Sequence, residues 1–166
     1  MDKKLQDKLF KKYPELFRQK NLSMRETCMC WGLSCSAGWY TLLDNLCSWL
    51  NWNMKNNSHM FPQVEFTQIK EKFGTLRAYY TTRALTEDEY NKLKKKEVFL
   101  PKTYKEYLKS DLIRGGEEIS GVVSFAEHLS GTICEICGLP GKTIEINKWW
   151  HTVCSKHEKE IRNGRK

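Results

Sequence analysis

The chain has 166 residues and a formal net charge of +8, with 28 lysines and arginines against 20 aspartates and glutamates. Apolar residues make up 40% of the sequence and charged residues 29%, a balance that excludes an intrinsically disordered chain. No apolar stretch is long enough to cross a bilayer, so we expect no membrane segment. The length predicts one domain, or one domain with a small added module. Its basic character attracts polyanions such as nucleotides, nucleic acids or acidic protein surfaces.

The cysteines and the amino end favour a reducing compartment. Seven cysteines is an odd number, so a closed set of disulfides would leave one unpaired. Residues 1–8 lack the apolar segment of a secretion signal. We therefore expect a cytoplasmic protein in which paired cysteines bind metal rather than form disulfides.

The first third of the chain predicts two helices with an ordered loop between them. Leu5 and Leu9 share one side of a short helix over 3–12, which Pro14 interrupts. The segment 28–38 contains two glycines and predicts the loop. A longer helix over about 38–54 follows, because its apolar residues recur at helical spacing. That stripe comprises Trp39, Leu42, Leu43, Leu46, Leu50 and Met54, with Cys47 beside it.

Two strands are expected next, joined by a hairpin. Apolar and polar residues alternate in each strand. The segment 70–74 predicts the hairpin, with Gly74 in the left-handed conformation. The expected inward residues are Val64 and Phe66 in the first strand and Leu76, Ala78 and Tyr80 in the second.

Capping signals place further helices after the strands. Thr86 with Glu89, and Thr103 with Glu106, each match the box in which an N-terminal hydroxyl and a glutamate exchange hydrogen bonds with the backbone. Gly115-Gly116 is expected to end the second of these helices. Another helix is predicted over about 118–129, and a frayed one over 158–166. The inward residues of the 118–129 helix are expected to be Ile119, Val122, Val123 and Ala126.

The strongest chemical signal is a pair of two-residue-spaced ligand motifs. Cys134-x₂-Cys137 is followed, after sixteen intervening residues, by Cys154-x₂-His157. Zn²⁺ takes four such ligands in a tetrahedron, and each pair can supply two from one tight turn. The intervening residues 143–151 predict a hairpin that joins the two turns, as in a zinc ribbon. A closed shell of four ligands has no position for a reacting water, so we expect one structural Zn²⁺.

Other metal assignments were left open by the residues. His151 could replace His157 as the fourth ligand, but the Cys-x₂-His spacing favours His157. His151 is then expected to be exposed or to support the ligands from outside. A second site formed by Cys28, Cys30, Cys35 and Cys47 is conceivable, although their spacing matches no zinc motif and free cysteines commonly serve as small buried apolar groups.

A basic and aromatic group marks the predicted hairpin as a candidate ligand site. Arg77 and Tyr79 share the outward face of the second strand, and Lys70 and Lys72 were expected at the hairpin tip. Guanidinium, ammonium and phenol groups on one surface suit phosphates with a stacked base. Ordinary solvent exposure of a polar strand face explains them equally well. The loop is expected to add Trp31 or Tyr40 as a stacking wall.

Catalytic signatures are weak. The four histidines are scattered, and the sequence has no nucleophile elbow, phosphate-binding glycine loop or paired-carboxylate motif. Cys30 could act as a nucleophile beside a histidine, but a cysteine in an ordered loop is more often structural. We predict no catalytic residues and no hydrolysis of nucleotides or peptides.

Three stretches of the chain resemble a type of small protein encoded by tailed phages and prophages. They are the Cys-Met-Cys-Trp-Gly segment from Cys28 with Gly38-Trp39 after it, the Lys-Glu-Lys-Phe-Gly hairpin from Lys70, and the ligand motifs from Cys134. Residues 12–17 fit as well, whereas about 84–117 resembles an insertion. The resemblance implies a phage setting, in which small proteins often act on host machinery or host defence. It implies no particular activity.

These observations predict an α+β chain in two parts. A helix packed on a small antiparallel β-hairpin sheet forms 1–131, with a helical insertion at about 84–117, and a zinc ribbon with a basic tail forms 132–166. The first functional hypothesis is a non-enzymatic binder of an anionic nucleotide-like ligand in the host cytoplasm, which could sequester a nucleotide signal of host immunity. A zinc-ribbon protein that binds DNA or RNA, an adaptor or inhibitor of a host protein, and an enzyme are the alternatives.

Overall fold

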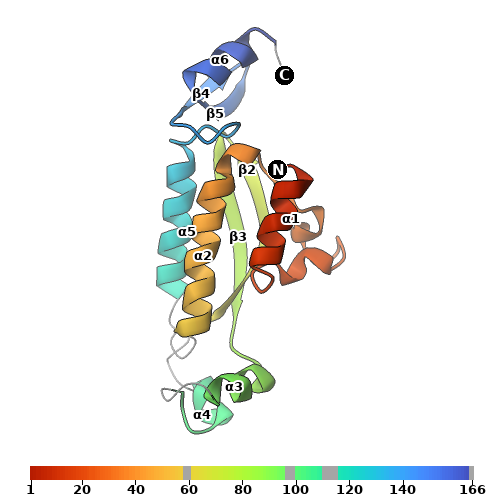
Figure 1. The fold of residues 1–166 in the computed structure, drawn as a ribbon, viewed down its shortest axis with the longest axis vertical. Coiled ribbons are helices and arrows are strands. Elements are labelled where there is room, and N and C mark those ends of the chain that lie inside the picture. The colour runs from red at the N-terminus through yellow and green to blue at the C-terminus, as the bar shows by residue number, and fades with distance from the viewer. Residues whose placement is uncertain (58–60, 96–99, 110–115, 165–166) are drawn as a thin grey trace.

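The computed structural model describes residues 1–57, 61–95, 100–109 and 116–164. Helices and sheets are mixed along an elongated molecule (Figure 1). Helices α2 and α5 lie side by side over one face of the sheet that contains β2 and β3. The β4–β5 hairpin and α6 lie at one end, and α3 and α4 lie at the other. The main elements are α1 (Lys3–Lys12), α2 (Tyr40–Asn56), β2 (Gln63–Lys72), β3 (Thr75–Arg83), α3 (Glu87–Lys94), α4 (Tyr104–Lys109), α5 (Gly116–Ser130), β4 (Lys142–Ile146), β5 (Trp149–Val153) and α6 (Ser155–Arg162).

The first sheet has three strands rather than the expected two. Within the predicted loop 28–38, β1 (Leu33–Ser34) pairs in parallel with β2, so that Leu33 lies opposite Ile69. Short 3₁₀ helices, η2 (Cys28–Trp31) and η3 (Ala37–Trp39), flank this strand. An earlier 3₁₀ turn, η1 (Arg18–Asn21), follows α1. This part of the predicted loop therefore forms the edge strand of the sheet. A strand of only two residues shows no apolar alternation from which the sequence could predict it.

The β2–β3 hairpin is longer and tighter than predicted. Its turn consists of Phe73 and Gly74, whose φ angles are 55° and 73°. A two-residue turn with positive φ at both positions follows the natural twist of paired strands, so the strands remain paired up to Lys72 and Thr75. Lys72 is the last residue of β2 and flanks this turn, whereas Lys70 lies inside the strand opposite Arg77, so the expectation that Lys70 lies at the tip was wrong.

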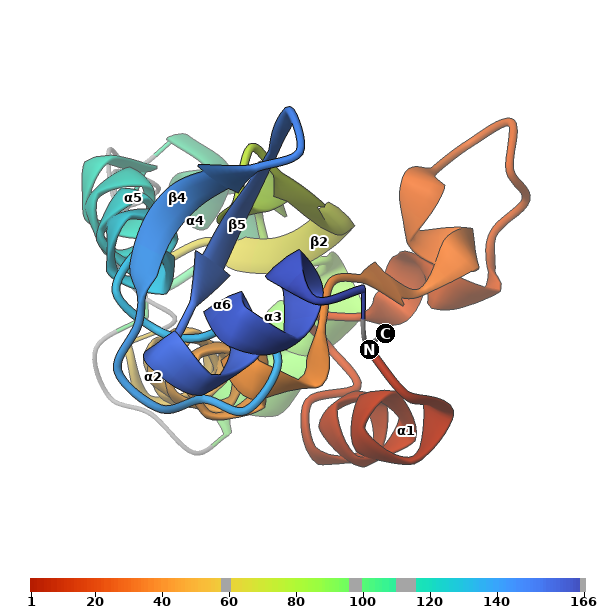
Figure 2. The same cartoon turned by 90° about the horizontal axis from the view of Figure 1, so that it is seen from above.

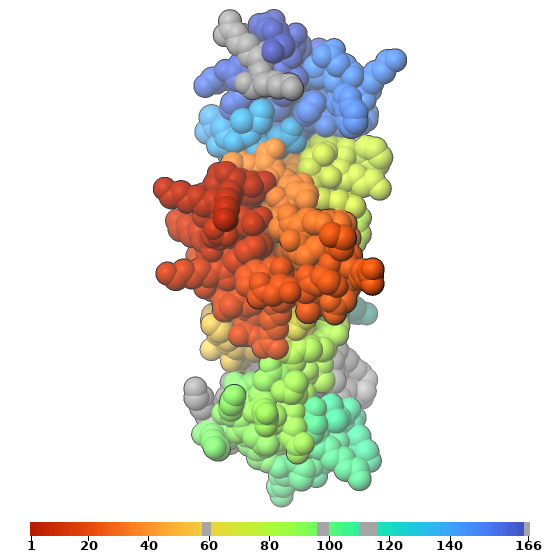
Figure 3. Space-filling model, turned by 90° about the vertical axis from the view of Figure 1, so that its right-hand side faces the viewer, coloured from red at the N-terminus to blue at the C-terminus, as the bar shows by residue number. Residues whose placement is uncertain are grey.

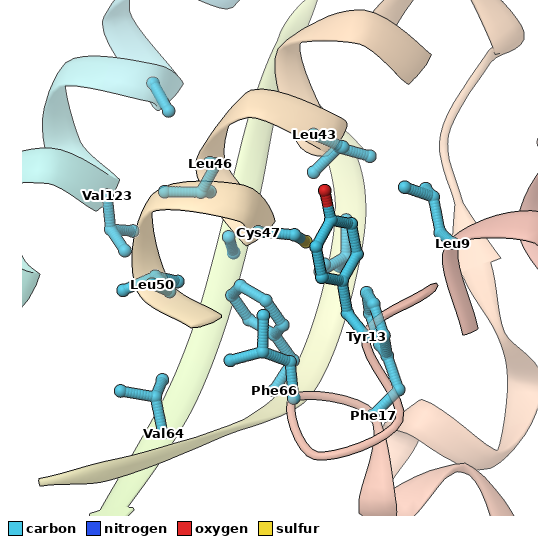
Figure 4. Packing of buried hydrophobic residues seen from close by; sticks show 14 of the residues in the cluster. Leu9, Tyr13, Phe17, Leu43, Leu46, Cys47, Leu50, Val64, Phe66 and Val123 are labelled. Atoms are coloured by element: carbon cyan, nitrogen blue, oxygen red, sulfur yellow. The ribbon is translucent and has the colours of Figure 1, made fainter. Parts of the chain in front are cut away.

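The core lies between the sheet and the helices. All six residues of the predicted stripe are buried, and Cys47 is fully buried beside them. Figure 4 shows Leu46, Cys47 and Leu50 of α2 between Val123 of α5 and the aromatic residues of the N-terminal segment. The expected inward faces of both strands are confirmed for Val64, Phe66, Leu76 and Ala78, which are buried, and Tyr80 packs at the margin of this core.

Both predicted capping boxes are present. The Thr86 hydroxyl accepts from the backbone N–H of Glu89 at 3.3 Å, and Thr103 accepts from Glu106 at 3.2 Å. Leu85 and Tyr90 join a small separate core with Leu100 and Tyr107. Gly116 begins α5 instead of ending the preceding helix, and Gly115 lies outside the described residues.

An ion-pair cluster joins this small core to the sheet. Arg83 donates to both carboxylate oxygens of Glu89, at 2.6 and 2.9 Å, and to Glu65 at 3.0 Å. Arg18 also donates to Glu89, at 2.9 Å. The Arg83 guanidinium holds the pKa of Glu89 well below its usual range.

Acid should weaken this attachment. Because the folded-state pKa of Glu89 is depressed, its stabilisation is complete above the unfolded value near 4.5 and is lost as the pH falls below it. We expect Glu89→Gln to lower the free energy of unfolding by about 1–2 kcal/mol at pH 7. The difference in this free energy between the variant and the wild type should shrink towards pH 3, as Glu89 of the wild type loses its advantage. Urea unfolding at both pH values measures this. An equal difference at pH 7 and pH 3 would contradict it.

Among the described residues, no helix combines the length and the apolar character needed to span a membrane.

Candidate metal centre and adjoining cleft

Four side chains converge at the C-terminal end of the molecule. Cys134 and Cys137 lie in the turn after α5, Cys154 is the N-cap of α6, and His157 lies in the first turn of that helix. Their potential ligand atoms all lie within 4.8 Å of one another. All the cysteines are free thiols. This confirms the predicted grouping of Cys134, Cys137, Cys154 and His157 as a site that could hold a metal ion.

Three of the distances inside the group are close to those around a tetrahedral ion. The Nδ1 atom of His157 lies 3.4 Å from the Sγ atom of Cys134 and 3.3 Å from that of Cys154. The Sγ atoms of Cys137 and Cys154 lie 3.9 Å apart. Metal–ligand bonds of about 2.0–2.3 Å in a tetrahedron separate the ligand atoms by about 3.3–3.8 Å. The Nε2 atom of His157 lies 3.7 Å from a carboxylate oxygen of Glu160, an outer partner that can orient the ring.

Local backbone structure brings the ligands together. The N–H of Gly138 donates to the carbonyl of Cys134 at 2.9 Å, and Gly138 has a φ of 77°, so the turn folds back after Cys137. The β4–β5 hairpin then returns the chain to Cys154. Backbone N–H groups at the start of α6, chiefly that of His157, lower the pKa of the Cys154 thiol to about 6. The thiolate required for metal binding is thus favoured near neutral pH.

The metal module, residues 132–162, docks on the core through close backbone contacts. The N–H of Gly38 donates to the carbonyl of Glu135 at 2.8 Å, and the indole of Trp39 donates to the carbonyl of Ile133 at 2.9 Å. On the other side, the Thr152 hydroxyl donates to the carbonyl of Gly74 at 2.6 Å. Seen from above, the β4–β5 hairpin crosses the end of the sheet (Figure 2).

The four remaining cysteines do not form a second group of this kind among the described residues. Cys47 is part of the core, and burial raises its pKa far above the usual range. Burial also raises the pKa of Cys35 to about 11. The Cys30 thiol donates to the carbonyl of Thr27 at 3.1 Å, and Cys28 is half-buried. Cys28 and Cys30 share η2, whereas Cys47 lies in α2, and these separate roles favour the structural interpretation.

A cleft of about 810 Å³ opens where the metal module meets the core. Its walls come from three distant segments: 34–36 beside β1, 71–73 at the end of β2, and 148–151 at the start of β5. Glu135 of the metal module also lines it. The orange, yellow-green and blue surfaces of these segments meet on one face of the molecule in Figure 3. All three sequence motifs therefore converge on one place, which we call the junction cleft.

A buried hydrogen bond lies at the junction cleft. The Nδ1 atom of His151 and a carboxylate oxygen of Glu135 are 2.9 Å apart. The Glu135 side chain is only 9% exposed, and that of His151 is 29% exposed. Burial raises the pKa of Glu135, opposed by His151 and reinforced by the charge of Glu71. His151 therefore contacts the neighbour of a metal ligand rather than replacing His157.

The predicted ligand residues are distributed over several surfaces. Lys72 lines the junction cleft. Lys70 and Tyr79 lie on the outer face of the sheet, with the Lys70 ammonium 5.3 Å from the centre of the Tyr79 ring. Among the described residues, no hydrogen bond, ion pair or ring contact links these to Trp31 or Tyr40. Trp31 is exposed on η2, and Tyr40 lies on α2, where Lys8 covers its ring.

Arg77 lies in β3, the edge strand whose backbone N–H groups at Leu76 and Ala78 donate to side chains of α5. Its guanidinium donates to the hydroxyl of Thr75 at 2.8 Å and to the carbonyl of Leu76 at 2.7 Å. It shares a shallow depression with Glu127 and His128 of α5. Glu65 and Glu71, the acidic residues of the neighbouring strand β2, have other partners: Glu65 pairs with Arg83, and Glu71 accepts from the N–H of Gly74 at 2.6 Å.

Several residues of the junction cleft were missed by sequence reasoning. They carry the aromatic and charged groups that face the space between the two parts. The adjacent pair Trp149-Trp150 offered a signal, because side chains alternate along a strand and two neighbouring tryptophans cannot both enter one small core. The missed residues are Glu71, Phe73, Glu135, Lys148, Trp149 and Trp150.

Comparison of the chain with protein-family models, curated proteins and solved structures finds no match.

Proposed function

We propose that this chain is a non-enzymatic binding protein that holds an anionic nucleotide-like ligand in the junction cleft, beside one structural Zn²⁺. The observation that carries the proposal is the composition of the cleft rim. The ammonium groups of two lysines and three aromatic rings line the rim: Lys72, Lys148, Phe73, Trp149 and Trp150. Ammonium groups attract phosphates, and aromatic faces stack on bases at a gain of about 1–3 kcal/mol per base.

The metal proposal rests on ligand chemistry. Three thiolates and one imidazole at tetrahedral spacing match the structural zinc sites of small modules, and the hairpin between the two turns matches a zinc ribbon. Elemental analysis of protein purified without added metal should give one zinc per chain. A well-folded protein without zinc would refute this part of the proposal.

The size and form of the cleft favour a small ligand over a polymer. Its volume lies within the range of small-molecule sites. The cleft is not strongly basic, because the carboxylates of Glu71 and Glu135 offset the charges of Lys72 and Lys148. In the phage setting that the sequence resembles, a protein of this kind could sequester a nucleotide signal of host immunity. The function of the Lys70–Tyr79 pair would then be to extend the site along the outer face of the sheet.

The rim lysines provide the test. We expect the double variant Lys72→Ala, Lys148→Ala to weaken binding of nucleoside monophosphates and cyclic dinucleotides about 10- to 100-fold, since two charge-assisted contacts to phosphate are lost. Melting should be unchanged, because both side chains are exposed. Lys92→Ala, at the opposite end of the molecule on α3, is the matched control. Calorimetric titration measures the affinities.

Two results would overturn the proposal. One is equal affinity of the double variant and the wild type for every nucleotide that binds. The other is tight binding of oligonucleotides alone with a steep loss of affinity in salt, which indicates release of many counterions and a nucleic-acid partner.

A further inference from the structure

The junction cleft has a buried floor and an exposed rim of different chemistry. Glu135 and Cys35 are buried, and His151 is half-buried behind them. Lys72, Phe73, Lys148 and the two tryptophans are exposed, with Trp149 72% accessible. A nucleotide that enters with its phosphates at the lysines therefore places its base between the rings and directs the edge of the base to the floor.

The Glu135 side chain brings hydrogen-bond acceptors to the floor, whereas the N-terminal ammonium of Met1, which also lines the cleft, donates to the carbonyls of Leu33 and Cys35. Carboxylates accept and do not donate, so the 2.9 Å contact is a donation from Nδ1 of His151 to Glu135. No hydrogen bond from the described residues reaches the other ring nitrogen of His151, Nε2. Glu71 adds a second carboxylate to the cleft, with one oxygen engaged by the N–H of Gly74.

The bases differ in what their pairing edges offer to such a floor. Guanine presents two adjacent donors, the ring N1–H and the exocyclic 2-amino group, which a carboxylate can accept together. Adenine alternates a donor with an acceptor, and its ring nitrogen would face the acceptors of the floor without a partner. Hypoxanthine retains N1–H but lacks the 2-amino group. A buried polar group that is left unpaired loses far more affinity than one missing apolar contact.

We infer that the junction cleft selects a guanine nucleotide, with the pairing edge of the base on Glu135 and the phosphate at Lys72 and Lys148. This inference rests on the proposed function and specifies its ligand class. The selectivity arises from the floor, whereas the general affinity for nucleotides arises from the rim, so the two can fail separately.

Calorimetric titration with three probes tests the base selectivity: guanosine, inosine and adenosine 5′-monophosphates. We expect guanosine monophosphate to bind at least tenfold more tightly than inosine monophosphate and about 100-fold more tightly than adenosine monophosphate. Glu135→Gln should remove most of this preference, because its amide presents a donor to the edge. Glu145→Gln, on the exposed side of β4, is the matched control and should keep the preference.

A second variant protects the test from misfolding. Glu135 is adjacent to the ligand Cys134, so its replacement must retain zinc and the wild-type melting temperature to be interpreted. Glu71→Gln is exposed and distant in sequence from the metal ligands, and it should reduce the preference for guanine at least threefold.

The outcomes separate the two proposals. Similar affinities for all three monophosphates, reduced by the Lys72 and Lys148 changes, would overturn the guanine inference and leave the nucleotide function standing. Absence of binding by all three, together with binding of the guanidinium compound agmatine, would overturn both, because an acceptor floor with aromatic walls also suits an organic cation. An unchanged preference in both Glu135→Gln and Glu71→Gln would overturn the assignment of the floor.

Discussion

Cys154→Ser is expected to release the metal and unfold the module that carries it. Cys154 supplies one of the four proposed ligands, so its loss leaves three. Serine is a good N-cap residue, so the start of α6 should tolerate the change and the effect should come from the metal. The module buries few apolar residues, mainly Ile146, Val153 and Cys134 itself. Metal binding contributes on the order of 10 kcal/mol to the folding of such small modules. The remaining core cannot replace that contribution.

Elemental analysis and limited proteolysis measure the two parts of this prediction. Zinc should fall from one per chain to less than about a tenth, and cleavage should become rapid after residue 131 while the core remains resistant. Cys28→Ser is the matched control, because Cys28 lies outside the ligand group and should leave metal content unchanged. Stoichiometric zinc in a protease-resistant Cys154→Ser protein would contradict the assignment of this ligand.

Gly38→Ala is expected to undock the metal module from the core. A Cβ atom at this position would lie 2.1 Å from the carbonyl oxygen of Cys134 and 2.6 Å from the carbonyl carbon of Glu135. Both are backbone atoms, which cannot rotate away as a side chain does. The clash should also break the 2.8 Å hydrogen bond from Gly38 to Glu135. We expect a loss of about 3 kcal/mol or more.

The same substitution elsewhere provides the control. Gly121 lies in α5, and a Cβ atom there would meet nothing within 4 Å. Gly121→Ala should therefore raise the free energy of unfolding by about 0.5–1 kcal/mol, because alanine loses less backbone entropy in a helix. If the docking contact is as described, denaturant unfolding will show a lower free energy of unfolding for Gly38→Ala than for the wild type and a higher one for Gly121→Ala. A neutral Gly38→Ala would show that the module tolerates displacement.

The sequence predicted the elements with strong local signals and missed those that depend on pairing. The stripe of α2 and the capping box of Thr86 follow from helical spacing and hydrogen-bonding chemistry, and both are confirmed. In β2 a bulge between Phe66 and Gln68 shifts the alternation by one residue, so that Ile69 faces the core. Such a shift exists only in relation to the partner strand, and a single sequence does not encode it locally.

In the candidate site too, the part with a local sequence signal was predicted and the part assembled from distant segments was missed. The ligand spacing of Cys134, Cys137, Cys154 and His157 is local within each pair, which made their grouping predictable. The junction cleft is assembled by residues up to about 150 positions apart, from Met1 to His151. Neither Gly38 nor Gly74 has a side chain to mark it as a docking point, yet both meet the metal module through their backbones.

The shared construction of the junction cleft couples two binding equilibria. In the proposed function, one wall belongs to a module whose folding depends on a bound Zn²⁺, and the opposite wall belongs to the core that contains α2. A molecule that bridges the walls must favour the docked, ion-loaded form. Because coupling between two sites is reciprocal, this molecule must raise the affinity of the protein for the ion. The ion must raise the affinity for the molecule by the same factor. Resistance to a chelator thus becomes an assay for ligands of the cleft.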